Sequence, residues 1–152
     1  MARYTGADTP VETKSEKRVR YFLAVLFFLQ SVCTTFPFMH GMVGDEFKTI
    51  TALQLMIQPD GYEGKGDVLL AIIGALLVLM PVAAFFFCIL DSKSRVKYVA
   101  SGVCAVLSAV LITFSYMFSL GAIITLLLNV MSLFMTMQGV QGTTARMKSQ
   151  NN

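Results

Sequence analysis

The chain has 152 residues, of which 55% are hydrophobic and 14% are charged. A soluble domain carries roughly 25% charged residues, so this composition excludes a globule with a fully solvated surface. The charged residues are also clustered, because no Asp, Glu, Lys or Arg occurs in 21–44, 68–90 or 98–145. About 20 apolar residues in a helix cross the roughly 30 Å hydrocarbon core of a bilayer. The sequence therefore predicts an integral membrane protein.

The charge-free runs predict an all-α fold with four transmembrane helices. The first two runs, 21–43 and 68–90, each have the length of one crossing. The last run is about twice as long as one crossing, so we expect it to fold back as a tight hairpin of 98–117 and 120–138. The turn is expected within 114–121, where Ser115, Ser119 and Gly121 interrupt the apolar pattern. The transmembrane domain would then occupy 21–139, with an external loop at 44–67 and a cytoplasmic loop at 91–97.

Lys and Arg favour the cytoplasmic side of a membrane protein, and here they mark one side consistently. Ten of the 12 basic residues lie in the N-terminal segment 1–20, in the loop 91–97 or in the C-terminal tail 140–152. The loop 44–67 carries only Lys48 and Lys65. We therefore expect both termini in the cytoplasm and the chain in the plasma (cell) membrane.

The polar ends of the chain lack hydrophobic periodicity. For this reason 1–16 and 142–152 are expected to be weakly ordered unless a partner holds them. Tyr21 beside Arg20, and Tyr98 beside Lys97, have the pattern of interface anchors at the cytoplasmic edge of the bilayer.

The external loop 44–67 predicts a short amphipathic helix in its first half, beginning near Asp45. Apolar residues recur there at helical spacing, although the alternation within "LQLMI" also fits a strand. "PDG" at 59–61 then indicates a turn. The apolar side of this helix could dock a partner or only cover the helix ends, and its candidate residues are Phe47, Ile50, Leu53 and Ile57. The acidic residues of the loop do not have the spacing of a calcium-binding loop, so no metal site is expected.

Polar residues inside the last predicted span raise the question of what they face. Five small or polar residues follow one another at spacings of three or four and share one helix face; they are Gly121, Thr125, Asn129, Ser132 and Thr136. The preceding span carries a matching face of Ser101, Ala105 and Ser108. Because lipid offers an amide no hydrogen-bond partner, Asn129 should face inward and bind a neighbouring helix. Gln30 and Thr34 of the first span are further candidates, and Gln30 lies at a depth that would let it contact Asn129.

Two prolines fall inside the predicted spans. Pro37 and Pro81 each lack a backbone donor and are candidate kinks, with Pro81 nearer the middle of its span. His40, the single histidine, is expected near the external interface without an identified partner.

No catalytic constellation can be assembled from these residues, so the sequence predicts neither an enzyme nor a cofactor. The absence of charge within the spans also argues against an ion-coupled transporter or a voltage sensor. The first hypothesis is a non-catalytic module that acts through helix packing and its external loop, as accessory subunit, assembly factor or scaffold. The alternative is a small oligomeric channel or passive carrier, in which the polar face of 120–138 lines a neutral path. The expected partners are the lipid bilayer and another membrane protein or further copies of the chain, and not nucleic acid.

Overall fold

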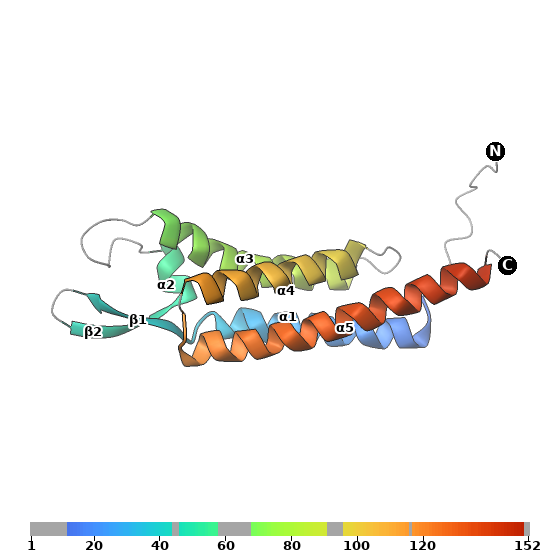
Figure 1. The fold of residues 1–152 in the computed structure, drawn as a ribbon, viewed down its shortest axis with the longest axis horizontal. Coiled ribbons are helices and arrows are strands. Elements are labelled where there is room, and N and C mark those ends of the chain that lie inside the picture. The colour runs from blue at the N-terminus through green and yellow to red at the C-terminus, as the bar shows by residue number, and fades with distance from the viewer. Residues whose placement is uncertain (1–11, 44–45, 58–67, 91–95, 116, 151–152) are drawn as a thin grey trace.

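The computed structural model describes residues 12–43, 46–57, 68–90, 96–115 and 117–150, without the side chains of 41–43, 46–47 and 146–150. Helix α1 (Lys14–Cys33) is followed by strands β1 (Pro37–Val43) and β2 (Glu46–Thr51) and by the short helix α2 (Ala52–Ile57). Helices α3 (Val68–Leu90), α4 (Val96–Phe114) and α5 (Leu120–Gln150) complete the fold. The four long helices run side by side, with the hairpin and α2 together at one end of them (Figure 1).

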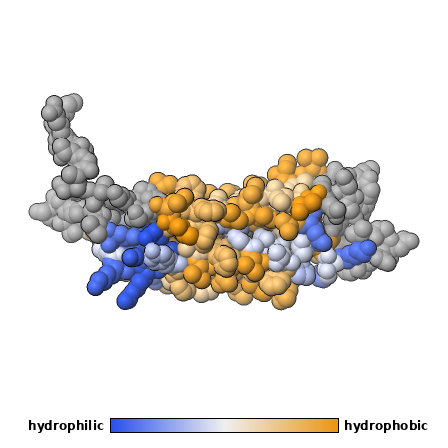
Figure 2. Space-filling view, turned by 180° about the vertical axis from the view of Figure 1, so that it is seen from behind, coloured by the Kyte–Doolittle hydropathy of each residue, from blue (hydrophilic) through white to orange (hydrophobic). Residues whose placement is uncertain are grey.

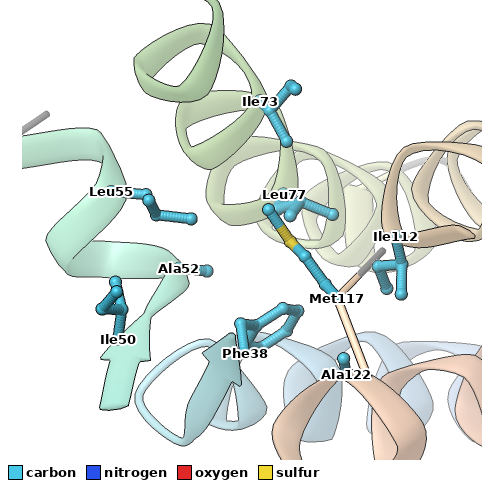
Figure 3. Packing of buried hydrophobic residues seen from close by; sticks show 9 residues of the cluster. All are labelled: Phe38, Ile50, Ala52, Leu55, Ile73, Leu77, Ile112, Met117 and Ala122. Carbon is cyan, nitrogen blue, oxygen red and sulfur yellow. The ribbon is translucent and has the colours of Figure 1, made fainter. Parts of the chain in front are cut away.

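The long helices form a closed bundle in which α1 and α4 each pack against both α3 and α5. One hydrophobic cluster lies at the hairpin end and draws on β1, β2, α2 and the three later helices (Figure 3); its buried residues are Phe38, Ile50, Ala52, Leu55, Ile73, Leu77, Ile112, Met117 and Ala122. A second cluster joins α1, α3 and α4; its buried residues are Leu23, Ala24, Phe27, Ala84, Cys88 and Tyr98. The hairpin and α2 therefore close one end of the bundle.

Within the part of the chain that the structure describes, three helices are long and apolar enough to span a membrane, namely α3, α4 and the part of α5 from Leu120 to Ala145. Large apolar side chains are exposed on their outer faces, as at Leu79, Val110 and Phe134. Figure 2 shows this hydrophobic middle beside a strongly hydrophilic patch at the end where α1 begins. These features support an integral membrane protein with a mainly helical fold.

Helix α1 begins earlier than the first predicted span. Thr13 and Glu16 form a capping box, in which the Thr13 hydroxyl accepts from the Glu16 N–H at 3.2 Å and the Glu16 carboxylate accepts from the Thr13 N–H at 2.9 Å. The weak order expected up to residue 16 is therefore wrong for Thr13–Glu16. The charge-free part of α1, Tyr21–Cys33, is only about 20 Å long. Any longer stretch of α1 includes charged residues, so α1 is not among the helices that are long and apolar enough to span a membrane.

Helix α1 also ends before the first predicted span does. The hydroxyls of Thr34 and Thr35 donate to the carbonyls of Ser31 and Val32 at 2.7 Å and so satisfy acceptors at the end of the helix. The chain then enters β1 at Pro37. The continuous helix expected over 21–43 is thus wrong beyond Cys33, and Pro37 lies outside any helix that it could kink.

The hairpin replaces much of the helix expected in the external loop. Strands β1 and β2 pair antiparallel, with His40 opposite Thr49 and an irregularity between Pro37 and Met39. The helical interpretation of the loop is therefore wrong for Glu46–Thr51, where backbone pairing with β1 satisfies the peptide groups. Residues 52–57 are helical, and the start of α2 is capped reciprocally by Thr51 and Gln54. The turn expected at 59–61 lies outside the described residues.

The later helices follow the charge-free runs more closely. Helix α3 has the bounds of the second run and continues on both sides of the buried Pro81. The break between α4 and α5 falls at 115–119, inside the segment where the turn was expected. Helix α5 does not end near 138 but continues to Gln150, and the Thr143 hydroxyl donates to the Gly139 carbonyl within it. The weak order expected from residue 142 is therefore wrong as far as Gln150.

Candidate functional site

The polar face of α5 is packed inside the bundle along its whole length. Gly121, Thr125, Asn129, Ser132 and Thr136 are all buried, and the same face continues through Gly139 and Thr143. Most of this face lies against α1 and α4, and its start at Gly121 meets β1. The spacing seen in the sequence therefore identifies an inward-facing surface.

Asn129 joins α5 to α4. Its side-chain amide donates to the Ser108 hydroxyl at 3.1 Å, and both side chains are buried. The Asn129 carbonyl oxygen has no hydrogen-bond partner among the described residues. The fully buried Asn129 amide thus forms a side-chain hydrogen bond with a neighbouring helix of the same chain.

Gln30 joins α1 to α5, but at a different position from the one expected. Its side-chain amide donates to the Ser132 hydroxyl at 3.2 Å. The contact expected between Gln30 and Asn129 is therefore replaced by one about a helical turn further along α5. The similar depths of Gln30 and Asn129 in their helices predicted the correct pair of helices but not the correct residue on α5.

The other residues of the predicted face serve the packing in different ways. The Thr125 and Thr34 hydroxyls donate to carbonyls of their own helices, those of Gly121 and Ser31. Ser101 lies 3.3 Å from the Cys88 sulfur and so contacts α3. Two further residues of the predicted set are buried, Ala105 and Thr136.

Gly121 permits a close approach between α5 and the start of β1. A Cβ atom at this position would lie 2.8 Å from the Pro37 carbonyl oxygen and 3.0 Å from the Phe36 Cβ. Only a residue without a side chain fits there, so Gly121 fixes the height at which the hairpin meets α5.

The external docking candidates do not form one face. Ile50 is buried in the hydrophobic cluster at the hairpin end, Leu53 is half-buried and Ile57 is exposed. Phe47 lies in β2 opposite Met42, and its side chain is outside the described set. The helical spacing that grouped these residues crosses the junction between β2 and α2, so it does not describe a surface.

His40 has a partner that the sequence did not reveal. Its Nε2 atom lies 2.9 Å from the Ser119 hydroxyl, at the turn before α5. This contact links β1 to the α4–α5 connection at the hairpin end of the bundle.

A buried charged cluster lies at the opposite end, and sequence reasoning missed it. One oxygen of Glu12 lies 3.1 Å from the Arg20 Nε and 3.1 Å from the Lys97 Nζ. Arg20 also donates from Nη1 to the carbonyls of Cys88 and Ile89, at 3.2 and 3.1 Å, in the last turn of α3. A cation at a helix C-terminus satisfies free carbonyls and complements the helix dipole. The cluster therefore joins the starts of α1 and α4 to the end of α3.

Tyr98 completes this end of the bundle. Its ring is fully buried, its hydroxyl donates to the Glu16 carbonyl at 3.4 Å, and it packs directly on Gly139 of α5. The expectation of an interface anchor is therefore wrong for Tyr98, whereas Tyr21 is exposed. The capping pattern of Thr13 and Glu16 was the signal in the sequence that α1 starts early enough to reach this site.

Two open grooves lie on the outer surface of the described helices. One, of about 580 Å³, follows the start of α1 and is lined by Lys14, Lys17, Arg18, Tyr21, Phe22 and Val25. The other, of about 450 Å³, lies between α4 and α5 and is almost wholly apolar; its lining includes Val99, Gly102, Val103, Val106, Leu107 and Val140. No three of the described His, Cys, Asp and Glu residues are placed to share a metal ion.

Comparisons of the chain with models of known protein families, with curated proteins and with solved structures find no match. The function must therefore be inferred from the geometry of this chain.

Proposed function

We propose that the chain is a four-pass protein of the plasma membrane, with both termini in the cytoplasm, and that it acts without catalysis as an accessory subunit, assembly factor or scaffold of a membrane complex. The observation that carries this proposal is that polar side chains of α5 form hydrogen bonds with other helices of the same chain. Asn129 binds Ser108, and Gln30 binds Ser132. The polar groups expected to carry any transport therefore serve helix packing.

Two close contacts between α5 and the chain around α1, one near each end of α1, support α1 as the fourth transmembrane crossing. Gly121 of α5 lies beside Pro37, and Gly142 lies beside Glu16, whose Cγ would be 3.8 Å from an added Cβ. The helix between these two glycines is about 31 Å long, close to the thickness of the hydrocarbon core. The chain from Glu16 to Pro37 covers the same height, so α1 and the short turn after it have together the reach of one crossing.

Burial of the α5 face favours packing over a polar path. A path needs polar atoms that face an open lumen, whereas Asn129 and Ser132 are fully buried and Thr125 nearly so. Hydrogen bonds between transmembrane helices contribute on the order of 0.6 kcal/mol each, so such a face is ordinary as a packing device. A channel or carrier built from this face would require the bundle to open.

The groove between α4 and α5 is the surface that we assign to a partner. Its wall is almost wholly apolar and consists mainly of valine side chains, and it includes Gly102. Helices associate in a bilayer through close van der Waals packing at such surfaces rather than through hydrophobic transfer. A transmembrane helix of another protein has the matching shape and chemistry.

The test is mass measurement of the affinity-purified chain taken from native membranes without detergent, with every co-purifying chain identified. A second protein in fixed stoichiometry is expected. Val106→Trp, which fills the groove, should remove most of that protein, while the matched Leu79→Trp on the exposed face of α3 should retain it. A preparation that contains only copies of this chain would overturn the subunit proposal, and flux of ions, water and neutral solutes in liposomes would then test the channel. Retention of the partner by Val106→Trp would show that the groove is not its site.

A further inference from the structure

The charged side chains at the start of α1 form buried ion pairs on one side of the helix and a purely basic surface on the other. Glu16 and Arg20 are buried, and Arg20 pairs with Glu12, which also pairs with Lys97. The exposed side carries Lys14, Lys17 and Arg18. Of the side chains described at this end, the acidic ones are all turned inward, so the outer face of α1 presents positive charge without a compensating carboxylate.

These three cations border a groove whose wall is apolar. The groove residues follow one another at helical spacing along one face of α1, beginning with the three cations and continuing with Tyr21, Phe22 and Val25. The three apolar side chains are all well exposed. The Lys17 ammonium lies 6.0 Å from the centre of the Tyr21 ring, so the basic and aromatic parts of the groove are continuous. The volume of about 580 Å³ is sufficient for a bulky ligand that is part polar and part apolar.

Contacts on the inner side of α1 place the groove at the edge of the hydrophobic spans. Arg20 reaches the carbonyls of Cys88 and Ile89 at the end of α3, and the Glu16 carbonyl accepts from Tyr98 at the start of α4. Tyr21 and the residues after it therefore run alongside α3 and α4, while Lys14, Lys17 and Arg18 lie level with or beyond the ends of those helices. Figure 2 shows the corresponding step from a hydrophilic end to a hydrophobic middle.

We propose that this groove is a binding site for one anionic phospholipid of the cytoplasmic leaflet. The phosphate and any further headgroup charge lie against Lys14, Lys17 and Arg18, and an acyl chain lies along Tyr21, Phe22 and Val25. Basic residues at the membrane surface attract anionic lipid, and aromatic residues settle at headgroup level. An acidic segment of a soluble protein would satisfy the cations but would leave the apolar half of the groove unfilled. The inference rests on the membrane topology proposed above and not on the identity of any partner protein.

The experiment uses the full chain in phosphatidylcholine nanodiscs that contain a minor fraction of phosphatidylglycerol, with the bound lipid counted by native mass spectrometry. The wild-type chain should retain phosphatidylglycerol in preference to phosphatidylcholine. Lys17→Gln with Arg18→Gln should lower that preference about 25-fold, since each basic residue near an anionic surface contributes a factor of about five. The charge-preserving pair Lys17→Arg and Arg18→Lys should keep most of it. Lys48→Gln, at the opposite end of the bundle, is the matched control and should change the preference less than twofold.

A second measurement needs only the wild-type chain. A phosphatidylglycerol analogue with a photoreactive acyl chain should label peptides that contain Tyr21 to Val25 more than peptides from the exposed faces of α3. Equal retention of the two lipids by the wild type, equal loss in Lys48→Gln, or uniform labelling would each overturn the lipid site. None of these results would affect the partner measured with Val106→Trp. Removal of the chain from membranes by alkaline carbonate would instead contradict the membrane topology on which both proposals stand.

Discussion

Gly139 and Gly142 lie one turn apart on α5, and replacing each with alanine should change stability in opposite directions. A Cβ atom at Gly139 would lie 2.6 Å from Cδ1 and 2.7 Å from Cζ of Tyr98, and closer still to Cε1. Tyr98 is fully buried and its hydroxyl contacts the Glu16 carbonyl, so a shift of its ring would disturb other contacts. Overpacking of this kind costs about 1–3 kcal/mol, against a gain of roughly 0.5–1 kcal/mol from replacing glycine inside a helix. Gly139→Ala should therefore lower the free energy of unfolding by about 1–2 kcal/mol.

Gly142 is the matched control because its nearest neighbour would lie at 3.8 Å, an ordinary van der Waals distance. Gly142→Ala keeps the helix gain without the clash and should raise the free energy of unfolding by roughly 0.5–1 kcal/mol. The assay is reversible unfolding in mixed micelles, followed by circular dichroism at increasing SDS. Adding Tyr98→Leu should remove most of the penalty of Gly139→Ala, since the two positions are in contact. Equal stability of the two alanine variants would refute the close packing of Tyr98 on α5.

Three further predictions follow from the buried contacts. In a double-mutant cycle of Asn129→Ala and Ser108→Ala, the coupling in unfolding free energy should be about 0.6 kcal/mol and below about 1.7 kcal/mol; a coupling of zero would show that the bond does not tie α5 to α4. Arg20→Met should lower the free energy of unfolding by about 3 kcal/mol or more, because it leaves the Glu12 carboxylate with one fewer cation in a buried cluster. Arg18→Met, at an exposed position, is the control, and an equal loss of stability in the two variants would contradict the burial of the Arg20 ion pair. Gly74→Ala places a Cβ 2.8 Å from a backbone nitrogen of α2 and should increase proteolysis of the α2 segment, whereas unchanged cleavage would argue against the close packing of α2 on α3.

The long helices could be predicted because their boundaries are set by charge and hydropathy. Helix α3 has no charged residue from Val68 to Leu90, and nothing within it competes with a helix of one crossing. The inward face of α5 could also be predicted, since the spacing of its polar residues fixes which side of the helix they share. The partners of those residues could not, because they depend on how far each neighbouring helix is shifted along its axis. Gln30 meets Ser132 instead of Asn129 for that reason.

The hairpin was missed because hydropathy does not distinguish an apolar strand from the end of an apolar helix. Residues 37–43 continue the charge-free run of α1, and only Thr34, Thr35 and Pro37 indicate that the helix stops. The charged cluster was missed for a different reason. Its members are far apart along the chain, with Glu12 and Lys97 separated by 85 positions. No local pattern reports such a contact.

The closed arrangement of the four long helices has a consequence for how the protein is made. Helix α1 leaves the ribosome before α5, yet the Ser132 hydroxyl that pairs with Gln30 belongs to α5. In the four-pass arrangement that we propose, the Gln30 amide enters the bilayer without its native acceptor until α5 arrives, a state that lipid cannot relieve. Completion of the bundle is therefore a late event in synthesis. In that proposed arrangement, a chain cut short before α5 would display an unsatisfied amide in the membrane, by which a cell's quality-control machinery could recognise it as unfinished.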